Sequence, residues 1–287
     1  MNRPLRSWMF VPGNIPRFLE KIYEIDQPPD VALFDLEDGV LPENKPTARK
    51  MIAEVLKRSR PGPLRAVRVN AVGTDWFDED MKAILVDGLE AICVPKVESL
   101  EDLAPVAEAL AGFDGSVQII PAIESANGLL RAREIAGAKD VLAIVFGTED
   151  YALDLGFGTR REGEAADLLF ARSAFVNAAA AAGVLSVDGV FPDLENPEGL
   201  LADVIQSRRL GFRAKSTFNP RQIDVINEWF SPRADELEYA RKVVAAFEEA
   251  KARGDASVAV GGQLVDRPIV LRAHRLLELS GERPSEE

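Results

Sequence analysis

The chain has 287 residues, of which 47% are hydrophobic, and its formal net charge is −13 at pH 7. This length suits one large α/β barrel or two smaller domains, and the acidic balance argues against nucleic acid or an anionic membrane surface as a partner. No apolar run approaches the roughly 18 residues of a membrane-spanning helix, and MNRPLRSWMF lacks a signal-peptide core, so we expect a cytoplasmic protein.

The chain contains one cysteine and one histidine, which limits the chemistry open to it. Cys93 lies in the apolar run AICVPK, where a buried thiol is expected, and a single cysteine excludes an intrachain disulfide and fits a reducing compartment. His274 is alone, so zinc sites built on several histidines are excluded. Acid–base chemistry is therefore expected from carboxylates, lysine, tyrosine or water.

Apolar runs recur through residues 1–230 with helical segments between them. Continuous apolar runs are typical of parallel strands buried on both faces. An open doubly wound sheet is the alternative, but VPGNIPR after the first run is not the GxGxxG phosphate turn of that fold. The alternation of strands and helices therefore predicts a TIM (β/α)8 barrel. The predicted strands are Ser7–Gly13, Asp30–Asp38, Leu64–Asn70, Ala91–Lys96, Val117–Glu124, Val141–Gly147, Val184–Asp193 and Gly211–Asn219.

The pattern changes after residue 230, which predicts a separate extension over residues 231–287. Pro232–Gly254 has the pattern of a long amphipathic helix, and Ile269–Leu279 that of a last helix. Ser257–Pro268 between them has the pattern of a hairpin that turns at Gly261-Gly262. We expect this helix–hairpin–helix extension either to buttress the barrel or to act as a lid over a site.

Polar side chains follow the predicted strands of the barrel. In a TIM barrel the carboxyl ends of the strands meet at one rim, where active sites lie. The sequence therefore predicts that these residues share that rim. They are Asp35, Glu37, Asp38, Arg68, Asn70, Lys96, Glu124, Glu149, Asp150, Asp188 and Lys215.

Glu124 and Asp150 end two consecutive predicted strands and lie 26 positions apart. A βαβ crossover brings the carboxyl ends of its two strands to the same edge of the sheet. Two carboxylates at one edge repel each other unless a positive charge lies between them. The spacing therefore predicts a site for a hard divalent cation such as Mg²⁺.

Seven segments taken together resemble the citrate lyase β-subunit family, a branch of the HpcH/HpaI aldolase and citrate lyase superfamily that also has malyl-CoA and citramalyl-CoA lyases nearby. The resemblance extends from Arg6 to about Leu277. It implies a TIM barrel with a C-terminal extension, usually assembled as a homotrimer. The segments are RSWMFVPGNIPR, DLEDGVLPENKPTAR, RVN, VPK, PAIESANG, VFGTEDYALDLG and GGQLVDRP.

The resemblance also implies roles for individual residues. Glu124 in IESANG and Asp150 in GTED correspond to the family's magnesium ligands, and Arg68 in RVN corresponds to the arginine that faces the substrate. A fixed guanidinium and a metal ion would stabilise the enolate that forms when a carbon–carbon bond next to a thioester breaks. The alternative for Arg68 is a barrel-interior arginine paired with Glu37 or Asp35.

Other residues complete the expected site. Gly147, Thr148 and Glu149 precede a predicted helix, and their backbone N–H groups are expected to hold a substrate carboxylate. Asp266 in GGQLVDRP corresponds to an aspartate that family lyases contribute from the lid of a neighbouring subunit, where it acts as an acid–base group. Its alternative role is the N-cap of the last helix.

Two further features concern the substrate. Near the first predicted strand, basic residues are candidates for the phosphates of coenzyme A. Asn219 stands where the family commonly has a histidine, in FNP instead of IHP, so the resemblance leaves the acyl group open. The basic candidates are Arg3, Arg6, Arg17 and Lys21.

The sequence thus predicts a magnesium-dependent carbon–carbon lyase whose partners are an acyl-CoA and a 2-oxo acid. It would cleave a 3-hydroxyacyl-CoA thioester of the citramalyl-CoA or malyl-CoA type into acetyl-CoA and a 2-oxo acid, or run the reverse reaction. Alternatives are a citrate lyase β subunit that acts on an acyl-carrier thioester and a malyl-CoA-type thioesterase. A CoA-binding module without catalytic activity is the alternative of a different class.

Overall fold

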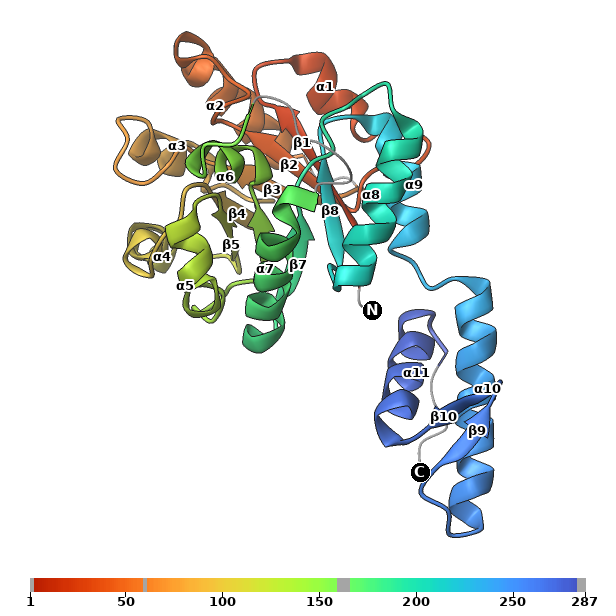
Figure 1. The fold of residues 1–287 in the computed structure, drawn as a ribbon. Helices are drawn as coiled ribbons and strands as arrows, with labels where there is room; N and C mark the ends of the chain where they lie inside the picture. The colour runs from red at the N-terminus through yellow and green to blue at the C-terminus, as the bar shows by residue number, and fades with distance from the viewer. Residues whose placement is uncertain (1–2, 59–60, 159–165, 283–287) are drawn as a thin grey trace. The chain divides into compact units, whose positions relative to one another are not determined.

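A computed structural model describes residues 3–58, 61–158 and 166–282 of the chain. The chain divides into two compact units, Met1–Asn227 and Glu228–Glu287, and each is described by itself (Figure 1). The boundary expected from the sequence, after residue 230, lies close to this division. Among the described residues, no helix has the length and apolar character needed to span a membrane.

The first unit is a closed barrel of eight parallel strands, so the predicted TIM barrel is confirmed. The last strand closes the barrel against the first, with Ser7 opposite Lys215. Each strand falls within the apolar run that predicted it. The strands are β1 (Ser7–Pro12), β2 (Val31–Asp35), β3 (Leu64–Arg68), β4 (Ala91–Val94), β5 (Gln118–Ile123), β6 (Ala143–Phe146), β7 (Leu185–Asp188) and β8 (Ala214–Thr217).

Helices surround the barrel and connect its strands (Figure 1). Asn196 caps the helix that begins at Pro197, since its side chain accepts a hydrogen bond from the Gly199 N–H at 2.8 Å. Ser99 bonds to Asp102, and a 3₁₀ turn, Glu101–Leu103, precedes the next helix. The helices are α1 (Pro16–Lys21), α2 (Lys45–Leu56), α3 (Phe77–Ile84), α4 (Ala104–Ala111), α5 (Ala126–Ala136), α6 (Thr148–Asp154), α7 (Leu169–Ala182), α8 (Pro197–Leu210) and α9 (Ile223–Trp229).

Alternate residues of each strand fill the inside of the barrel. Leu64 and Ala66 of β3, and Ile120 and Ala122 of β5, belong to this buried cluster. Because side chains alternate between the two faces of a strand, the next inward positions lie at the carboxyl ends. These positions carry Asp35, Arg68, Glu124 and Ser216.

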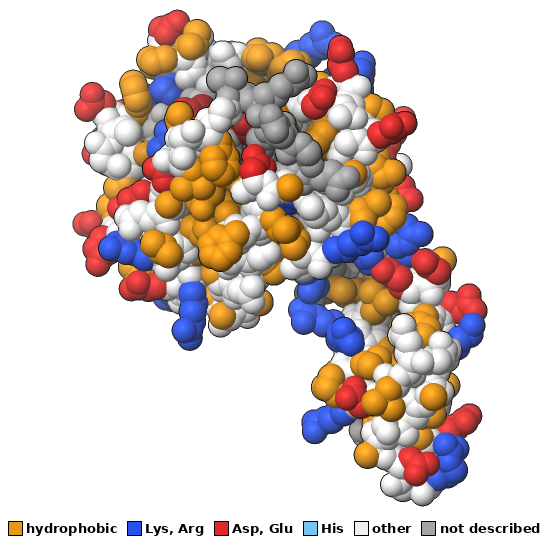
Figure 2. All heavy atoms as spheres, viewed as in Figure 1, with side chains coloured by type: hydrophobic (Ala, Val, Ile, Leu, Met, Phe, Trp, Pro, Cys, Tyr) orange, Lys and Arg blue, Asp and Glu red, His pale blue; other side chains and the backbone are white. Residues whose placement is uncertain are grey.

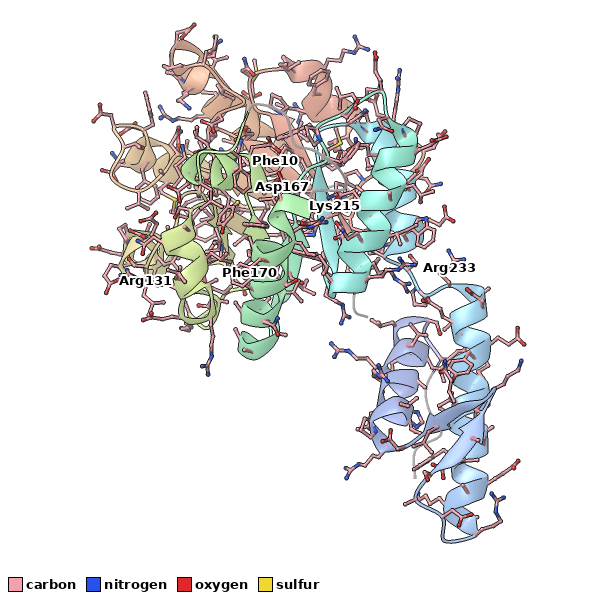
Figure 3. The ribbon with its side chains drawn as sticks, in the orientation of Figure 1. Phe10, Arg131, Asp167, Phe170, Lys215 and Arg233 are labelled. Carbon is pink, nitrogen blue, oxygen red and sulfur yellow. The ribbon has the colours of Figure 1, made fainter. Side chains whose placement is uncertain are left out.

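Asp188 and Lys215 occupy the opposite face of their strands, so the prediction that they share the rim is wrong. Their neighbours Val187 and Ala214 belong to the inner cluster, which turns these two side chains toward the helix layer. There Lys215 Nζ lies 3.1 Å from an oxygen of Asp188 and 2.6 Å from one of Asp203 on α8 (Figure 3). Arg172 on α7 pairs with both carboxylates. The buried charges therefore balance and join the sheet to two helices.

The second unit consists of a hairpin between two helices, as the sequence predicted. The helices are α10 (Ala234–Ala252) and α11 (Arg267–Leu279), and the hairpin strands are β9 (Val258–Val260) and β10 (Gln263–Val265). The turn residues Gly261 and Gly262 both have positive φ, at 58° and 81°, which suits the glycine pair that marked this turn. The unit has its own core, to which Val243, Val265 and Leu277 contribute.

Candidate active site

The carboxyl ends of the barrel strands surround a pocket, and four of the predicted site residues with charged side chains line it together. Arg68, Glu124 and Asp150 contribute to its wall, beside Thr148 and Glu149. The rest of the lining is largely apolar and comes from other strand ends. It includes Phe10, Cys93, Val145, Val190, Ser216 and Phe218.

Arg68 is held in one plane by its neighbours. Its Nε and Nη2 donate to the two carboxylate oxygens of Asp35 at 2.8 and 2.7 Å, and its Nη1 lies 3.0 Å from Glu37 Oε2. The Phe10 ring lies 4.6 Å from the guanidinium carbon. Burial alone would lower the pKa of Arg68, but the charges and hydrogen bonds of Asp35 and Glu37 raise it above its usual value. The sequence offered Glu37 or Asp35 as a partner of Arg68, and in the structure Arg68 pairs with both. These ion pairs still leave the guanidinium beside the pocket.

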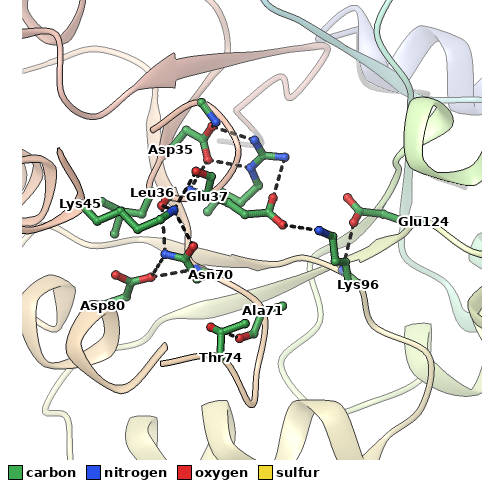
Figure 4. Close-up of polar contacts among 12 residues, drawn as sticks. Asp35, Leu36, Glu37, Lys45, Asn70, Ala71, Thr74, Asp80, Lys96 and Glu124 are labelled. Atoms are coloured by element: carbon green, nitrogen blue, oxygen red, sulfur yellow. Dashed lines mark hydrogen bonds and ion pairs between the residues drawn. The ribbon is translucent and has the colours of Figure 1, made fainter. Parts of the chain in front are cut away.

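The turn after β2 is fixed from both sides. The Glu37 N–H donates to Asp35 Oδ1 at 2.9 Å. On the other side the buried Lys45 donates to the carbonyl oxygens of Leu36 and Glu37, at 2.7 and 2.9 Å (Figure 4). Lys45 also donates to Asn70 Oδ1 at 2.7 Å, which joins the turn to the end of β3. These bonds set the direction in which the Glu37 side chain leaves the backbone.

Glu37 is a member of this site that the sequence predicted only as a possible partner of Arg68. Its side chain is buried, and burial raises its pKa to about 7, while the positive charges of Arg68 and Lys96 act against this rise. Besides Arg68, its partner is Lys96, whose Nζ lies 3.4 Å from Glu37 Oε1. Nothing in the order DLED indicated this second partner, which follows another strand.

Lys96 links the two halves of the site. Its backbone N–H donates to Glu124 Oε2 at 3.1 Å, and its side chain reaches Glu37 (Figure 4). Lys96 has φ of +56°, a left-handed conformation that is uncommon for a residue with a side chain. No residue pattern in VPK indicates this conformation.

Glu124 is buried at the end of β5. Burial is the largest cause that raises its pKa to about 8, and the negative charges of Glu37 and Asp150 add to this rise. Gly147 leaves room for it, because a Cβ at that position would lie 2.4 Å from Glu124 Cγ and 2.7 Å from its Oε1. Glu124 and Asp150 therefore face the same pocket and repel each other, as two carboxylates that share a cation would in the absence of that cation.

The donor set fits magnesium. The described residues contain no group of three or more histidine, cysteine or acidic side chains arranged to hold a metal ion. Magnesium does not need such a cage, since it usually binds through one or two carboxylates and completes its shell with water and substrate oxygens. Glu124 and Asp150 supply oxygens of that kind, and their mutual repulsion favours a cation between them.

The remaining predicted site residues differ in position. The Gly147 N–H donates to the Ile123 carbonyl at 3.0 Å, so this one of the three expected anion-binding N–H groups is already engaged. Asp266 belongs to the second unit and stands at the N-cap position of α11, yet its side chain makes no capping hydrogen bond.

Asn219 stands where the resembling family commonly has a histidine. Its Oδ1 accepts a hydrogen bond from the Arg221 N–H at 3.1 Å, so Asn219 stabilises the turn after β8.

A second cavity lies beside the first and is almost entirely apolar. It shares Phe10 and Phe218 with the charged pocket, and among the described residues that line it Lys21 alone is charged. Arg3 and Arg6 precede β1 and therefore lie at the opposite end of the barrel strands, where Arg6 bonds to Asp30. Of the basic residues suggested as binding the phosphates of coenzyme A, Lys21 thus lies near the site. Arg3 and Arg6 lie too far from it to remain candidates.

Known proteins resemble this chain over most of its length. A family model described as HpcH/HpaI aldolase/citrate lyase matches residues 6–220. The citrate lyase subunit beta of Leuconostoc mesenteroides subsp. cremoris is 38% identical over 286 residues, which cover 96% of this chain and 93% of that protein. The (3S)-malyl-CoA thioesterase of Cereibacter sphaeroides is 34% identical over 275 residues, covering 96% of this chain and 94% of that protein.

A solved structure is also similar. The protein CitE from Mycobacterium tuberculosis, in complex with magnesium, acetoacetate and coenzyme A, superposes with a TM-score of 0.80 at 30% sequence identity. The alignment covers 96% of this chain and 98% of that one.

Proposed function

The chain belongs to the HpcH/HpaI aldolase/citrate lyase family, and on that basis we propose that it is a magnesium-dependent carbon–carbon lyase acting on acyl thioesters. Its substrate would be a 3-hydroxyacyl-CoA of the citramalyl-CoA or malyl-CoA type. Cleavage would give acetyl-CoA and a 2-oxo acid, and the reverse reaction would join them.

The observation that carries this proposal is the shared pocket of Arg68, Glu124 and Asp150. One side of the pocket is acidic and suits a cation, while the other presents a guanidinium. A substrate with a carboxylate and an adjacent hydroxyl oxygen can meet the cation, and its thioester oxygen can meet the arginine. The similar structure that contains magnesium, acetoacetate and coenzyme A supports the proposal of a site for a metal ion and a coenzyme A thioester.

Glu124 and Asp150 would hold the magnesium ion. When bound, the ion would hold the substrate carboxylate and polarise the neighbouring oxygen that becomes the ketone. Thr148 and Glu149, at the start of α6, line the same pocket, and their backbone N–H groups would orient the carboxylate. Gly147 contributes by leaving space for Glu124.

Arg68 would stabilise the negative charge that forms on the thioester oxygen when the carbon–carbon bond breaks. Its orientation is already fixed by Asp35, Glu37 and the Phe10 ring, so little reorganisation is needed as the charge develops. Such preorganised donors are usually the largest electrostatic contribution to catalysis.

Asp266 would move the proton at the acyl α-carbon. In cleavage the substrate hydroxyl would lose its proton to solvent as the carbon–carbon bond breaks, and Asp266 would give a proton to the enolate carbon. In condensation Asp266 would remove a proton from acetyl-CoA, and the oxygen of the former ketone would take one up from solvent. Its carboxylate is not used as a helix cap, which supports an acid–base role. We propose that it acts as part of a lid, residues 231–287, that reaches the pocket of a neighbouring subunit.

The apolar cavity beside the charged pocket would receive part of the thioester arm. Phe10 and Phe218 line both cavities, so a substrate held by the cation could extend past them. Lys21 is placed to meet a negative charge at the edge of that cavity.

We propose a homotrimer in the cytoplasm. Leu130 on α5, Leu153 on α6 and Phe170 on α7 are 87%, 76% and 82% exposed. Figure 2 shows hydrophobic side chains gathered on the face that carries these helices in Figure 1, and Figure 3 labels Phe170 there. Exposed apolar patches of this kind mark association surfaces. The single buried Cys93 supports a reducing compartment.

The test is a set of 3-hydroxyacyl-CoA thioesters incubated with the protein and Mg²⁺, with acetyl-CoA and the 2-oxo acid measured by mass spectrometry. Equal amounts of both products support the lyase. The variants Glu124→Gln and Asp150→Asn should lose cleavage, and EDTA should abolish it in the unchanged protein. Full activity in EDTA would contradict the magnesium proposal.

Two other activities have support from named relatives. The similarity to a malyl-CoA thioesterase favours hydrolysis on the same scaffold, and free CoA without a 2-oxo acid would decide for it. The similarity to citrate lyase β subunits favours a carrier-bound thioester, and cleavage of an acyl-carrier substrate in preference to the CoA ester would decide for that. Stoichiometric CoA binding without turnover would leave only a binding module.

A further inference from the structure

Lys96 adopts a left-handed backbone conformation at the centre of the site. Its φ of +56° is one of two positive values among the described residues other than glycine, the other being +62° at Asp140. Such a conformation costs about 1 to 3 kcal/mol for a residue with a Cβ and persists where the surroundings fix it. It follows Val94 and Pro95 at the end of β4, and it turns the Lys96 N–H toward Glu124 Oε2, 3.1 Å away.

The side chain of the same residue points toward the other half of the site. Lys96 Nζ lies 3.4 Å from Glu37 Oε1, while Glu37 Oε2 lies 3.0 Å from Arg68 Nη1. The Lys96 side chain is 49% exposed and that of Glu37 only 6%. The half-exposed ammonium of Lys96 therefore covers the buried carboxylate of Glu37 (Figure 4). That carboxylate in turn contacts Arg68.

We propose that Lys96 is a positioning residue with two separable actions. Its left-handed backbone aims an N–H at Glu124 and so sets the carboxylate for the metal ion. Its ammonium holds Glu37 against Arg68 and so sets the guanidinium for the developing negative charge. The ammonium action rests on the proposed function, because its effect is on catalysis. The backbone action concerns metal affinity alone.

The backbone action is tested with Lys96→Gly and Lys96→Val. Glycine keeps the left-handed conformation, whereas a β-branched residue strongly disfavours it and should turn the N–H away from Glu124. The probe is Mn²⁺, with its dissociation constant measured by electron paramagnetic resonance on the full chain. Lys96→Gly should stay within about threefold of the unchanged protein, and Lys96→Val should bind about tenfold more weakly, as expected for loss of one hydrogen bond to a charged group.

Asp140 supplies the matched control. It has nearly the same φ but lies before β6, at the end of the barrel away from the pocket. Asp140→Gly and Asp140→Val should both leave Mn²⁺ affinity unchanged. The free energy of unfolding of Asp140→Val shows how far a β-branched residue in a left-handed position destabilises the protein away from the pocket. Equal Mn²⁺ affinity in Lys96→Gly and Lys96→Val would overturn the backbone action.

The ammonium action is tested by kinetics. Lys96→Met keeps the chain length but removes the charge, so kcat should fall about 10- to 100-fold, the range expected when a catalytic group is misplaced by about 1 Å. KM and Mn²⁺ affinity should change little, and butylammonium should restore part of the kcat of Lys96→Gly because the position is half exposed. An unchanged kcat in Lys96→Met, or an equal loss in Lys82→Met at an exposed surface pair, would overturn this action.

The two proposals fail in different ways. If the unchanged protein cleaves no thioester but the Mn²⁺ results follow the expected order, the proposed function fails and the backbone action stands. If the unchanged protein is an active lyase and every Lys96 variant has the same activity and Mn²⁺ affinity as the unchanged protein, the proposed function stands and this inference fails.

Discussion

Asp35 and Arg68 form a bidentate ion pair at the mouth of the barrel, with N–O distances of 2.8 and 2.7 Å and almost no exposure of the carboxylate. Asp35 also accepts the N–H groups of Glu37 and Gly39, both at 2.9 Å. The pair therefore orients the arginine and the turn that carries Glu37 at the same time.

Asp35→Asn should therefore reduce both stability and activity. An amide cannot balance the buried guanidinium, and breaking a buried pair in this way typically costs about 3 to 5 kcal/mol. Urea unfolding measures the loss. The control is Glu79→Gln in the exposed Glu79–Lys82 pair, which should leave the urea midpoint almost unchanged. Equal effects of the two substitutions would show that Asp35 does not have this role.

Gly147→Ala should weaken metal binding without unfolding the protein. The new methyl would lie 2.4 Å from Glu124 Cγ, so the carboxylate must move away from its position beside Asp150. Calorimetric titration with Mg²⁺ should show a loss of about tenfold or more. Gly112→Ala is the control, because a Cβ there meets no atom within 4 Å. An unchanged Mg²⁺ affinity in Gly147→Ala would mean that Glu124 is not a ligand or that it relaxes without cost.

The stability of the metal-free protein should fall as pH rises from about 4.5 to 8. Burial raises the pKa of Glu124 from 4.5 to about 8, so the folded state binds this proton more tightly than the unfolded state does. The resulting stabilisation is complete below pH 4.5 and is lost as pH rises through 8. Glu37, with a pKa of about 7, acts in the same direction.

Thermal unfolding of the unchanged protein and Glu124→Gln, in EDTA, isolates this contribution from other titrating groups. The variant should show a flatter dependence on pH over that range. Added Mg²⁺ should stabilise the unchanged protein more at the alkaline end than at the acidic end, because the ion binds the ionised carboxylate. Parallel curves for the two proteins would contradict the assignment.

Asp266→Asn should reduce lyase activity by about 10²- to 10⁴-fold while the Mg²⁺ affinity stays the same, since the residue moves a proton and holds no ion. If Asp266 acts in the pocket of a neighbouring subunit, mixing this variant with Glu124→Gln should restore part of the activity. Mixed assemblies then contain some pockets in which both residues are intact. Each variant incubated alone is the control, and no recovery after subunit exchange would point to action within one chain.

Continuous apolar runs carried enough information to predict the barrel, because a strand buried on both faces needs apolar residues throughout. The period of two also explains which strand-end residues reach the pocket. Arg68 and Glu124 continue the inward positions of their strands, whereas Asp188 and Lys215 continue the outward ones. The prediction for these last two was wrong because it considered position along the strand and not the face.

Other features had no local pattern that could reveal them. The left-handed conformation of Lys96 opposes the preference of a lysine and is maintained by contacts with Glu124 and Glu37, which come from other strands. The room that Gly147 leaves for Glu124 likewise depends on two neighbouring strands in register. The contact of Glu37 with Lys96 depends in turn on the loop after β2, which Lys45 joins to the end of β3.

Part of the apolar wall of the pocket comes from a different sector of the barrel than the charged residues. Arg68 ends β3, and Glu124 and Asp150 follow β5 and β6, while Val190 and Phe218 follow β7 and β8. Selection or engineering can therefore exchange Val190 and Phe218 to admit a bulkier or smaller acyl chain while the charged residues keep their contacts. Relatives with different substrates would then be expected to diverge first along that apolar arc.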